Sequence, residues 1–283
     1  MIIKKAFSLI EISLVIIIIA ILIAGSLNGI EMVKKAKLAT AQSLTEQSVV
    51  GQIKDLTVWY ETSLQSSFID SERDNGLKIS TWKDINPNTL IPNNATQSSS
   101  ANQPTFFDNR FNDAIPGLYF DGNDFLNFIG TELVKSAYSV FIVEKRMSGG
   151  ALLTMIGGLT TAVNSNLILA YRNSTAITQA HYGNDIDFAV PAYSSPIVRM
   201  HSFLFNGTYG KKYWLNGGVT PDRTDATQTA SLIAYNNAYL GRYIDYYYFG
   251  DIAEIIIFKR SLTSQERMSI EAYLSKKYNI AIE

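Results

Sequence analysis

The carboxylate of Glu11 is the first side chain in this sequence that needs a specific charge partner. It stands at the head of an apolar run, because residues 12–24 carry no charge. A helix over residues 7–27 would reach about 31 Å, which matches a hydrocarbon core of about 30 Å. Burying a carboxylate there costs at least about 2.5–3.5 kcal/mol, so Glu11 requires a nearby positive group. Lys4 and Lys5 precede the run and favour a cytoplasmic N-terminus.

The residues from Ala6 to Glu11 resemble the N-terminus of type IV pilins and pseudopilins. That family has a short basic leader, a small residue before the cleavage point, usually Gly, and a Phe that begins a long hydrophobic helix. The resemblance implies that a prepilin peptidase cuts between Ala6 and Phe7 and that Phe7 becomes N-methylated. It also implies that Glu11 pairs with the Phe7 amine of a neighbouring pilin or pseudopilin subunit. The alternative is an uncleaved signal anchor.

This resemblance predicts how the chain is divided and where it is found. Residues 1–6 would be a leader peptide, and residues 7–53 a pilin-like helix whose transmembrane part covers about 7–27. Residues 56–283 would form the head. The protein would sit in the bacterial inner membrane before assembly, with one pass, and afterwards in the periplasm or in an extracellular pilus.

The apolar spacing supports a long helix followed by strands. Helix-like spacing continues over residues 28–53 and no proline occurs before Pro87, so we expect one helix of roughly 70 Å. Short apolar runs that end at Gly, Asn, Asp or Pro then predict an all-β sandwich. Residues 251–258 read as one of its strands. Thr263 and Glu266 have the spacing of a capping box and predict a short C-terminal α-helix.

The predicted head contains short motifs at residues 58–61, 79–84, 94–96, 102–104, 118–126, 250–258 and 273–278. Through these motifs it resembles the laminin-G-like, concanavalin A-like jelly-roll superfamily. The resemblance implies a jelly-roll β-sandwich, so the expected fold class is a long N-terminal α-helix plus that sandwich and a short C-terminal helix. It also implies a carbohydrate or surface ligand, because the superfamily includes lectins.

The sequence lacks the residues that a hydrolase of this superfamily would need. Glucanases of this superfamily use a Glu-x-Asp-x-x-Glu strand whose two catalytic carboxylates lie about 5–5.5 Å apart. Glu72 and Asp74 make the one Glu-x-Asp here, without the third carboxylate and in a predicted loop. His181 and His201 read as structural, and Ser202 beside His201 makes no triad. We therefore expect no enzymatic activity, with a hydrolase on a pilin-like stem as the alternative.

Two short clusters are candidate ligand sites. Tyr246, Tyr247 and Tyr248 are adjacent aromatic residues that can stack on sugars, although strand alternation would bury about half of such a cluster. Residues 121–124 read Asp-Gly-Asn-Asp, which can offer oxygens to Ca²⁺ or simply form a tight turn. No other cofactor is indicated.

Composition narrows the functional classes further. The 283 residues hold 24 basic and 25 acidic side chains, for a net charge of −1. No concentrated basic face for nucleic acid is expected from that balance. The sequence thus predicts a structural and adhesive pilin-like subunit, either a pilin or a secretion-system pseudopilin. The alternative is a membrane-tethered, lectin-like carbohydrate-binding protein that does not polymerise.

Overall fold

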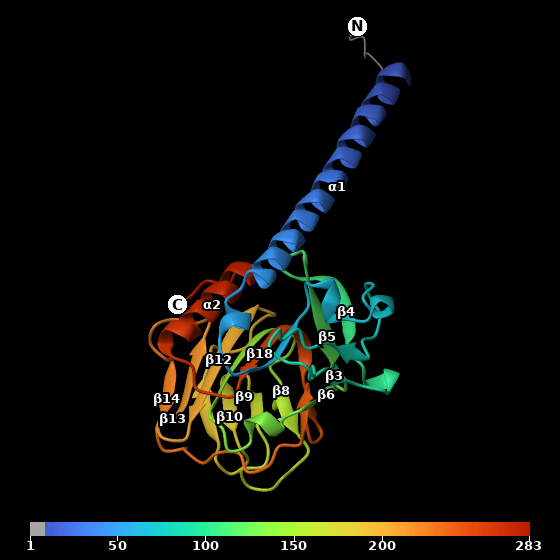
Figure 1. The fold of residues 1–283 in the computed structure, drawn as a ribbon. Coiled ribbons are helices and arrows are strands. Elements are labelled where there is room, and N and C mark those ends of the chain that lie inside the picture. Colours follow the sequence, from blue (N-terminus) through green and yellow to red (C-terminus); the bar gives the residue numbers. More distant parts are fainter. Residues whose placement is uncertain (1–8) are drawn as a thin grey trace.

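Most of the predicted stem is one continuous helix. A computed structural model describes residues 9–283 (Figure 1), and in the first part of the helix it describes the side chains of Val15, Ile16 and Ile19, then all from Gly29 onward. Helix α1 (Leu9–Glu46) has 38 residues. At 1.5 Å per residue it is about 57 Å long. It projects away from the rest of the chain, so that the beginning of the helix lies far from the sheets (Figure 1).

Helix α1 ends earlier than residue 53. After Glu46 the chain turns and forms a short 3₁₀-helix, η1 (Val50–Gln52). The β-branched Val49 and Val50 and the following Gly51 are poor helix formers, and Val50 is fully buried against the head. Burial of that side chain therefore takes precedence over helix continuation.

The described residues 56–258 form two eight-stranded sheets that pack face to face, so the predicted β-sandwich is confirmed. The helix-side sheet has the order β14-β13-β12-β7-β18-β5-β4, with β1 also paired to β18. Its strands are β1 (Leu56–Glu61), β4 (Thr105–Phe111), β5 (Ile115–Asp121), β7 (Tyr138–Arg146), β12 (Arg199–Asn206), β13 (Gly210–Leu215), β14 (Arg223–Asp225) and β18 (Phe249–Phe258).

The second sheet, which we call the groove-side sheet, has the order β11-β10-β9-β8-β15-β6-β3-β2. Its edges are short, because β2 has two residues and β11 has four. Its strands are β2 (Thr81–Trp82), β3 (Ala95–Thr96), β6 (Leu126–Ile129), β8 (Leu153–Gly158), β9 (Ile168–Asn173), β10 (Ala176–Ala180), β11 (Ile186–Ala189) and β15 (Asn237–Leu240).

Strand β18 explains why residues 251–258 are apolar almost throughout. Ile255 and Ile257 face the core between the two sheets, whereas Ile256 and Phe258 face a second core on the outer side of the helix-side sheet. A strand that is buried on both faces reads as a continuous apolar run. Residues 251–258 lie within β18, as predicted.

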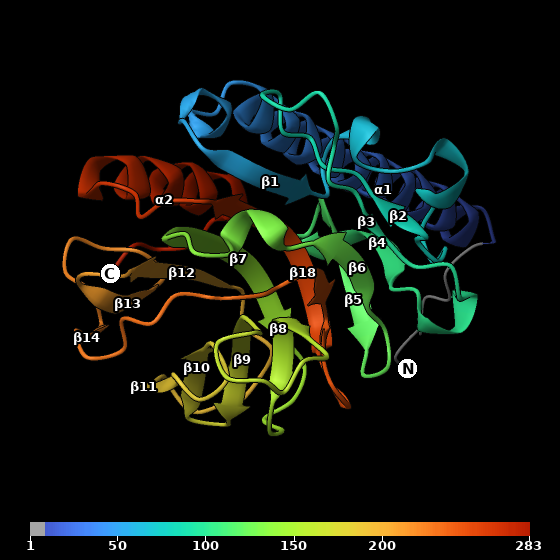
Figure 2. The same ribbon diagram turned by 60° about the horizontal axis from the view of Figure 1, so that its bottom comes forward.

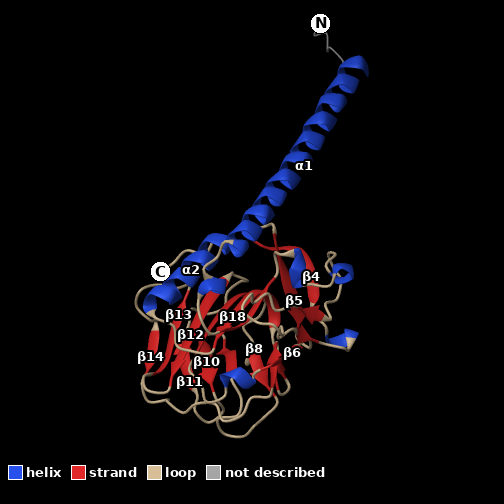
Figure 3. Cartoon of the chain, in the orientation of Figure 1, coloured by secondary structure: helices blue, strands red, loops and turns tan. Residues whose placement is uncertain are grey.

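Helix α2 (Ser264–Tyr278) covers that second face. Thr263 and Glu266 form the predicted capping box, in which each side chain bonds the backbone N–H of the other. Ile270 and Leu274 of α2 are fully buried in the second core. Figure 2 shows α1 and α2 on one side of the sandwich and β8 to β11 on the other. The confirmed architecture is a long N-terminal helix, a β-sandwich and a short C-terminal helix (Figure 3).

The end of α1 is docked to the head rather than free. Ala41 belongs to the same buried cluster as α2, and Leu44 packs against it. The Gln42 side chain donates a hydrogen bond of 2.9 Å to the carbonyl of Ser63. Within the described residues, no helix is apolar over a sufficient length to span a bilayer.

Candidate functional site

An open groove lies on the outer face of the groove-side sheet, where β2, β3, β6 and β15 lie next to one another. Its volume is about 490 Å³, within the range of about 300–1,000 Å³ that small-molecule sites occupy. Leu126 and Phe128 point into the core, so strand alternation turns Phe125 and Asn127 outward. The groove is lined by Ser80, Thr81, Thr96, Gln97, Ser98, Phe125, Asn127 and Tyr239.

One end of the groove carries a cluster of three aromatic rings, which we call the aromatic platform. The ring centroids of Phe125 and Tyr239 are 5.4 Å apart, and those of Phe125 and Tyr247 are 6.4 Å apart. Ring faces of this kind combine a large apolar area with a negative quadrupole, and the C–H face of a sugar ring can pack on them. The tyrosine hydroxyls add polar groups beside that apolar surface.

The guanidinium of Arg242 lies among these three rings. Its central carbon is 4.7 Å from the centroid of Phe125, 5.4 Å from that of Tyr247 and 5.8 Å from that of Tyr239. Its Nε donates a hydrogen bond of 2.7 Å to the carbonyl of Ile244, which holds the side chain in place. The aromatic platform therefore has one positive charge in a fixed position.

A short hairpin brings Arg242 and Tyr247 to the platform. It consists of β16 (Arg242–Tyr243) and β17 (Tyr246–Tyr247), and it folds back over the outer face of the groove-side sheet. A side chain at Gly157 of β8 would place its Cβ 2.4 Å from the carbonyl oxygen of Arg242, so only glycine allows this approach. Gly241, which joins β15 to this hairpin, has φ +84°, a conformation that favours glycine.

The amide side chains of the groove are held by the backbone. Gln97 donates to the carbonyl of Phe125 at 3.4 Å and accepts from the amide of Ser99 at 2.9 Å. Asn127 donates to the carbonyl of Ala238 at 3.1 Å. These bonds fix the orientation of the polar groups before any ligand arrives, which lowers the entropy cost of binding.

The three tyrosines predicted as sugar contacts have different environments. Tyr247 is half-buried and belongs to the platform. Tyr246 is 45% exposed and stacks on Tyr243, away from Phe125. The prediction for Tyr248 is wrong, because that side chain is fully buried in the core and donates to Glu144. Phe125, Tyr239 and Arg242 were missed from the sequence because Phe125 lies far along the chain from the other two residues.

Residues 121–124 form a tight turn next to the platform. The amide of Asn123 donates to the Asp121 side chain at 3.1 Å, and the amide of Asp121 donates to the Asp124 side chain at 3.0 Å. Burial raises the pKa of Asp124 to about 6, and Lys78 lies 3.4 Å from it. In the part of the chain that is described, no three His, Cys, Asp or Glu side chains converge as metal ligands. Calcium binding at this turn stays a prediction.

The other predicted carboxylate and histidine positions have structural partners. Glu72 ends η3 (Asp70–Glu72) and accepts from the backbone and hydroxyl of Ser80, so it belongs to no catalytic strand. His201 bonds Glu144 at 2.9 Å, whereas its neighbour Ser202 donates to Glu271 at 2.8 Å. His201 and Ser202 therefore form no catalytic pair.

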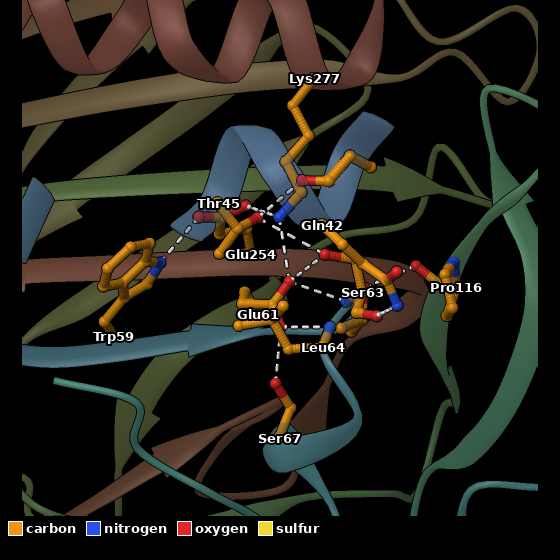
Figure 4. Close-up of polar contacts among 12 residues, drawn as sticks. Gln42, Thr45, Trp59, Glu61, Ser63, Leu64, Ser67, Pro116, Glu254 and Lys277 are labelled. Carbon is orange, nitrogen blue, oxygen red and sulfur yellow. Dashed lines mark hydrogen bonds and ion pairs between the residues drawn. The ribbon is translucent and has the colours of Figure 1, made fainter. Parts of the chain in front are cut away.

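A second group of charges is buried where α1, α2 and the helix-side sheet meet (Figure 4). The Nζ of Lys277 lies 3.0 Å from Glu61 and 2.8 Å from Glu254, and all three side chains are shielded from solvent. Burial alone would raise the pKa of Glu61, but Lys277 and bonds from Ser63 and neighbouring groups bring it below its usual value. With no access from solvent, this group is structural.

Several residues complete the hydrogen bonds of this buried group. Glu61 accepts from Ser63 and Ser67 at 2.6 Å each. Glu254 accepts from the indole of Trp59 and from the hydroxyl of Tyr273 at 2.8 Å each. Saturation by donors lets two carboxylates and one ammonium coexist in the interior.

Comparison with known proteins shows similarity at the level of fold. Comparison with family models gives no match, and comparison with curated protein sequences gives none either. Domain 4 of AbnA, a GH43 extracellular arabinanase from Geobacillus stearothermophilus solved with arabinotriose, superposes with a TM-score of 0.54 at 17% identity. The match covers 77% of this chain and 98% of that one.

A sialidase of Trypanosoma rangeli is also similar. Its complex with 2,3-difluorosialic acid gives a TM-score of 0.54 at 11% identity, covering 87% of this chain and 39% of the sialidase. Another structure of a sialidase from that organism gives 0.52 at 13% identity, and the match there covers 33% of the sialidase. The chain thus spans about a third of the sialidase's length, and these similarities establish a shared β-sandwich fold.

Proposed function

We propose that the sandwich head is a carbohydrate-binding domain of the concanavalin A-like jelly-roll type and that its binding site is the groove. The observation that carries the proposal is the aromatic platform beside fixed amide and hydroxyl groups. Sugars present an apolar C–H face and a polar rim of hydroxyls, and this groove offers a surface for each. The similarity to a domain solved with arabinotriose supports the proposal through the fold alone.

We propose binding without turnover. The groove lining consists of neutral polar and aromatic side chains, whereas glycoside hydrolysis generally needs two carboxylates on either side of the bond. Incubation of the full chain with each bound saccharide, followed by product analysis, should recover the saccharide intact. Release of shorter sugars would contradict this part of the proposal.

The direct test is saccharide binding by the full chain in detergent, measured by calorimetry over neutral and acidic oligosaccharides. Tyr239→Ala removes one ring of the platform and should weaken binding at least about tenfold, since aromatic contacts of this kind contribute about 1 kcal/mol or more beyond buried area. Tyr209→Ala is the matched control, because Tyr209 is 67% exposed and lies outside the groove lining. If Tyr239→Ala and Tyr209→Ala lost the same amount of saccharide affinity, the groove would not be the binding site. The same conclusion would follow if neither the parent nor the control bound any saccharide.

A second candidate function concerns the stem: assembly as a pilin-like or pseudopilin subunit. It is favoured by the uninterrupted α1 and by the exposure of its apolar residues Ile30, Met32 and Val33, at 55, 71 and 56%. Ala6 and Phe7 lie outside the described residues, and so does the side chain of Glu11 in α1. Under this proposal the head is displayed by helix packing in a fibre that starts from the inner membrane.

Processing and assembly distinguish this function from a simple membrane tether. After prepilin peptidase action the intact mass should correspond to a chain that begins at an N-methylated Phe7. Glu11→Ala should still insert into the membrane but should enter filaments poorly, because the Phe7 amine of the adjacent subunit would lose its partner. A mature chain that retains Met1, or normal incorporation of the variant, would favour the tether.

A further inference from the structure

We infer that the groove takes an acidic saccharide and that Arg242 binds its carboxylate or sulfate group. This inference rests on the proposed carbohydrate-binding function and specifies the class of ligand. The observation behind it is a guanidinium that is held in place at the edge of a sugar-sized groove and has no carboxylate partner in the described chain.

Arg242 differs from those arginines of the head that are paired with a carboxylate. Arg110, Arg172 and Arg267 each lie within 3.2 Å of a carboxylate oxygen. Among the described residues, no Asp or Glu comes within ion-pairing distance of Arg242, whose contacts are three rings and one backbone carbonyl. A guanidinium packed on rings gives up part of its hydration, and so an anion can bind it at a smaller desolvation cost than in open water.

The geometry suits a planar anion. The Nε bond to Ile244 uses one of the five N–H donors of Arg242. The two terminal nitrogens keep the fork that matches two oxygens of a carboxylate or sulfate. Because the rings and the Nε bond fix the guanidinium, little side-chain freedom remains to be lost on binding.

The surroundings do not oppose an anion. The groove lining has no acidic residue. Asp124, which precedes Phe125, is buried, and Lys78 lies 3.4 Å from it. Glu72 also lies beside the lining, where it accepts from the backbone and the hydroxyl of Ser80. Arg242 is the charged side chain that contacts the platform rings, so an acidic sugar can rest its ring on the platform while its charged group meets the guanidinium.

The test compares saccharides that differ in one group. Lactose, 3′-sialyllactose and 3′-sulfolactose form one set, and trigalacturonate with its methyl ester forms another. The full chain should bind an acidic member at least about tenfold more tightly than its neutral counterpart, since a hydrogen-bonded charge pair contributes about 1.5–3 kcal/mol. The carboxylated and sulfated arms separate the two anions. The preference should shrink as salt rises from 50 to 500 mM.

Variants assign the effect to one residue. Arg242→Gln should abolish the acidic preference, so that the acidic and neutral members of each set bind this variant with affinities within about twofold of each other. Arg223→Gln makes the same charge change on an exposed strand, β14, and should retain the preference. Arg242→Lys keeps the positive charge but loses the paired N–H donors of the guanidinium, so it should retain only a minor part of the preference for acidic saccharides. Thermal denaturation checks that each variant is folded.

The outcomes separate this inference from the function beneath it. If neutral and acidic sugars bind equally and Arg242→Gln changes nothing, while Tyr239→Ala still abolishes binding, the inference is wrong and the carbohydrate function stands. If no saccharide of either kind binds the folded parent, both are wrong. A preference that Arg223→Gln removes as completely as Arg242→Gln would reflect net charge and would also overturn the inference.

Discussion

The hydroxyl of Thr45 on α1 lies 3.1 Å from the hydroxyl of Tyr273 on α2, although these two residues are 228 positions apart in the sequence. The Tyr273 hydroxyl in turn donates to Glu254 at 2.8 Å. The stem helix is thereby joined to the buried charges around Lys277, and through them to β1 and β18. The direction in which the stem leaves the head depends on this junction.

Thr45→Val should weaken the docking of the stem without disturbing the rest of the head. The substitution keeps the shape of the side chain and leaves the Tyr273 hydroxyl with one partner fewer, at a cost of about 1 kcal/mol. Amide hydrogen exchange should become faster over residues 41–46. Thr40→Val is the control, because the Thr40 hydroxyl is exposed and bonds within its own helix, to Ala36. Equal exchange rates in both variants would show that the junction does not hold the stem.

Lys277→Met should destabilise the head by about 3–5 kcal/mol, because it leaves Glu61 and Glu254 buried without their cation. The free energy of unfolding in urea, followed by tryptophan fluorescence, measures the loss. Lys276→Met is a matched control on the same helix, where the side chain is exposed, and its effect should stay within about 0.5 kcal/mol. Similar values for the two variants would contradict the structural role given to this ion cluster.

Tyr248→Phe and Tyr246→Ala should distinguish the role of a core tyrosine in stability from the role of a surface tyrosine in saccharide binding. Tyr248→Phe removes a donor to the buried Glu144 and should lower the free energy of unfolding by about 1–3 kcal/mol, with saccharide affinity retained in the folded protein. Tyr246→Ala should change neither stability nor affinity appreciably, because Tyr246 stands apart from Phe125. A large loss of affinity in Tyr246→Ala alone would move the binding site to the other side of the hairpin.

The protein should lose stability as pH falls below about 6.5, partly through His181. Burial, and next the charge of Lys211, lower the pKa of His181 to about 3. The ring accepts from Tyr138 at 2.9 Å through Nε2 and donates to the carbonyl of Ala230 at 2.8 Å through Nδ1, which is the neutral form. Below pH 6.5 the unfolded chain binds a proton that the folded chain does not, so stability falls by up to roughly 1.4 kcal/mol per pH unit.

The contribution of His181 can be isolated by difference. The free energy of unfolding of the parent minus that of His181→Gln should shrink as the pH is lowered from 7 to 4, because the variant has no ring to titrate. His201 is present in both proteins, so its effect cancels. If this difference in free energy stayed constant over this pH range, the titration of His181 would not contribute to the loss of stability.

Local patterns in the sequence predicted the parts of the fold that depend on neighbouring residues. The capping box at Thr263, the strand over residues 251–258 and the long helix expected from near residue 7 each follow from spacing within one segment. The end of α1 did not, because burial of Val50 against the head is a tertiary effect. The buried charges at Lys277 also join distant segments, and so spacing gives no sign of them.

The candidate site shows the same division. Adjacent tyrosines drew attention to residues 246–248, yet Tyr248 turns into the core and Tyr247 is the one that reaches the platform. Phe125, Tyr239 and Arg242 meet because β6, β15 and the hairpin are neighbours in space. Only the alternation of strand residues indicated that part of an aromatic cluster would be exposed, and it could not select which part.

The short strands that close the sheets affect how many copies can share a surface. β2 and β14, which each form one edge of a sheet, have two and three residues, so these two edges offer few unpaired backbone groups to another molecule. Heads that lie side by side would then not pair through these edges into one continuous sheet. Each would keep its own groove open, and contacts too weak to hold singly could combine into strong avidity toward a glycan-coated surface.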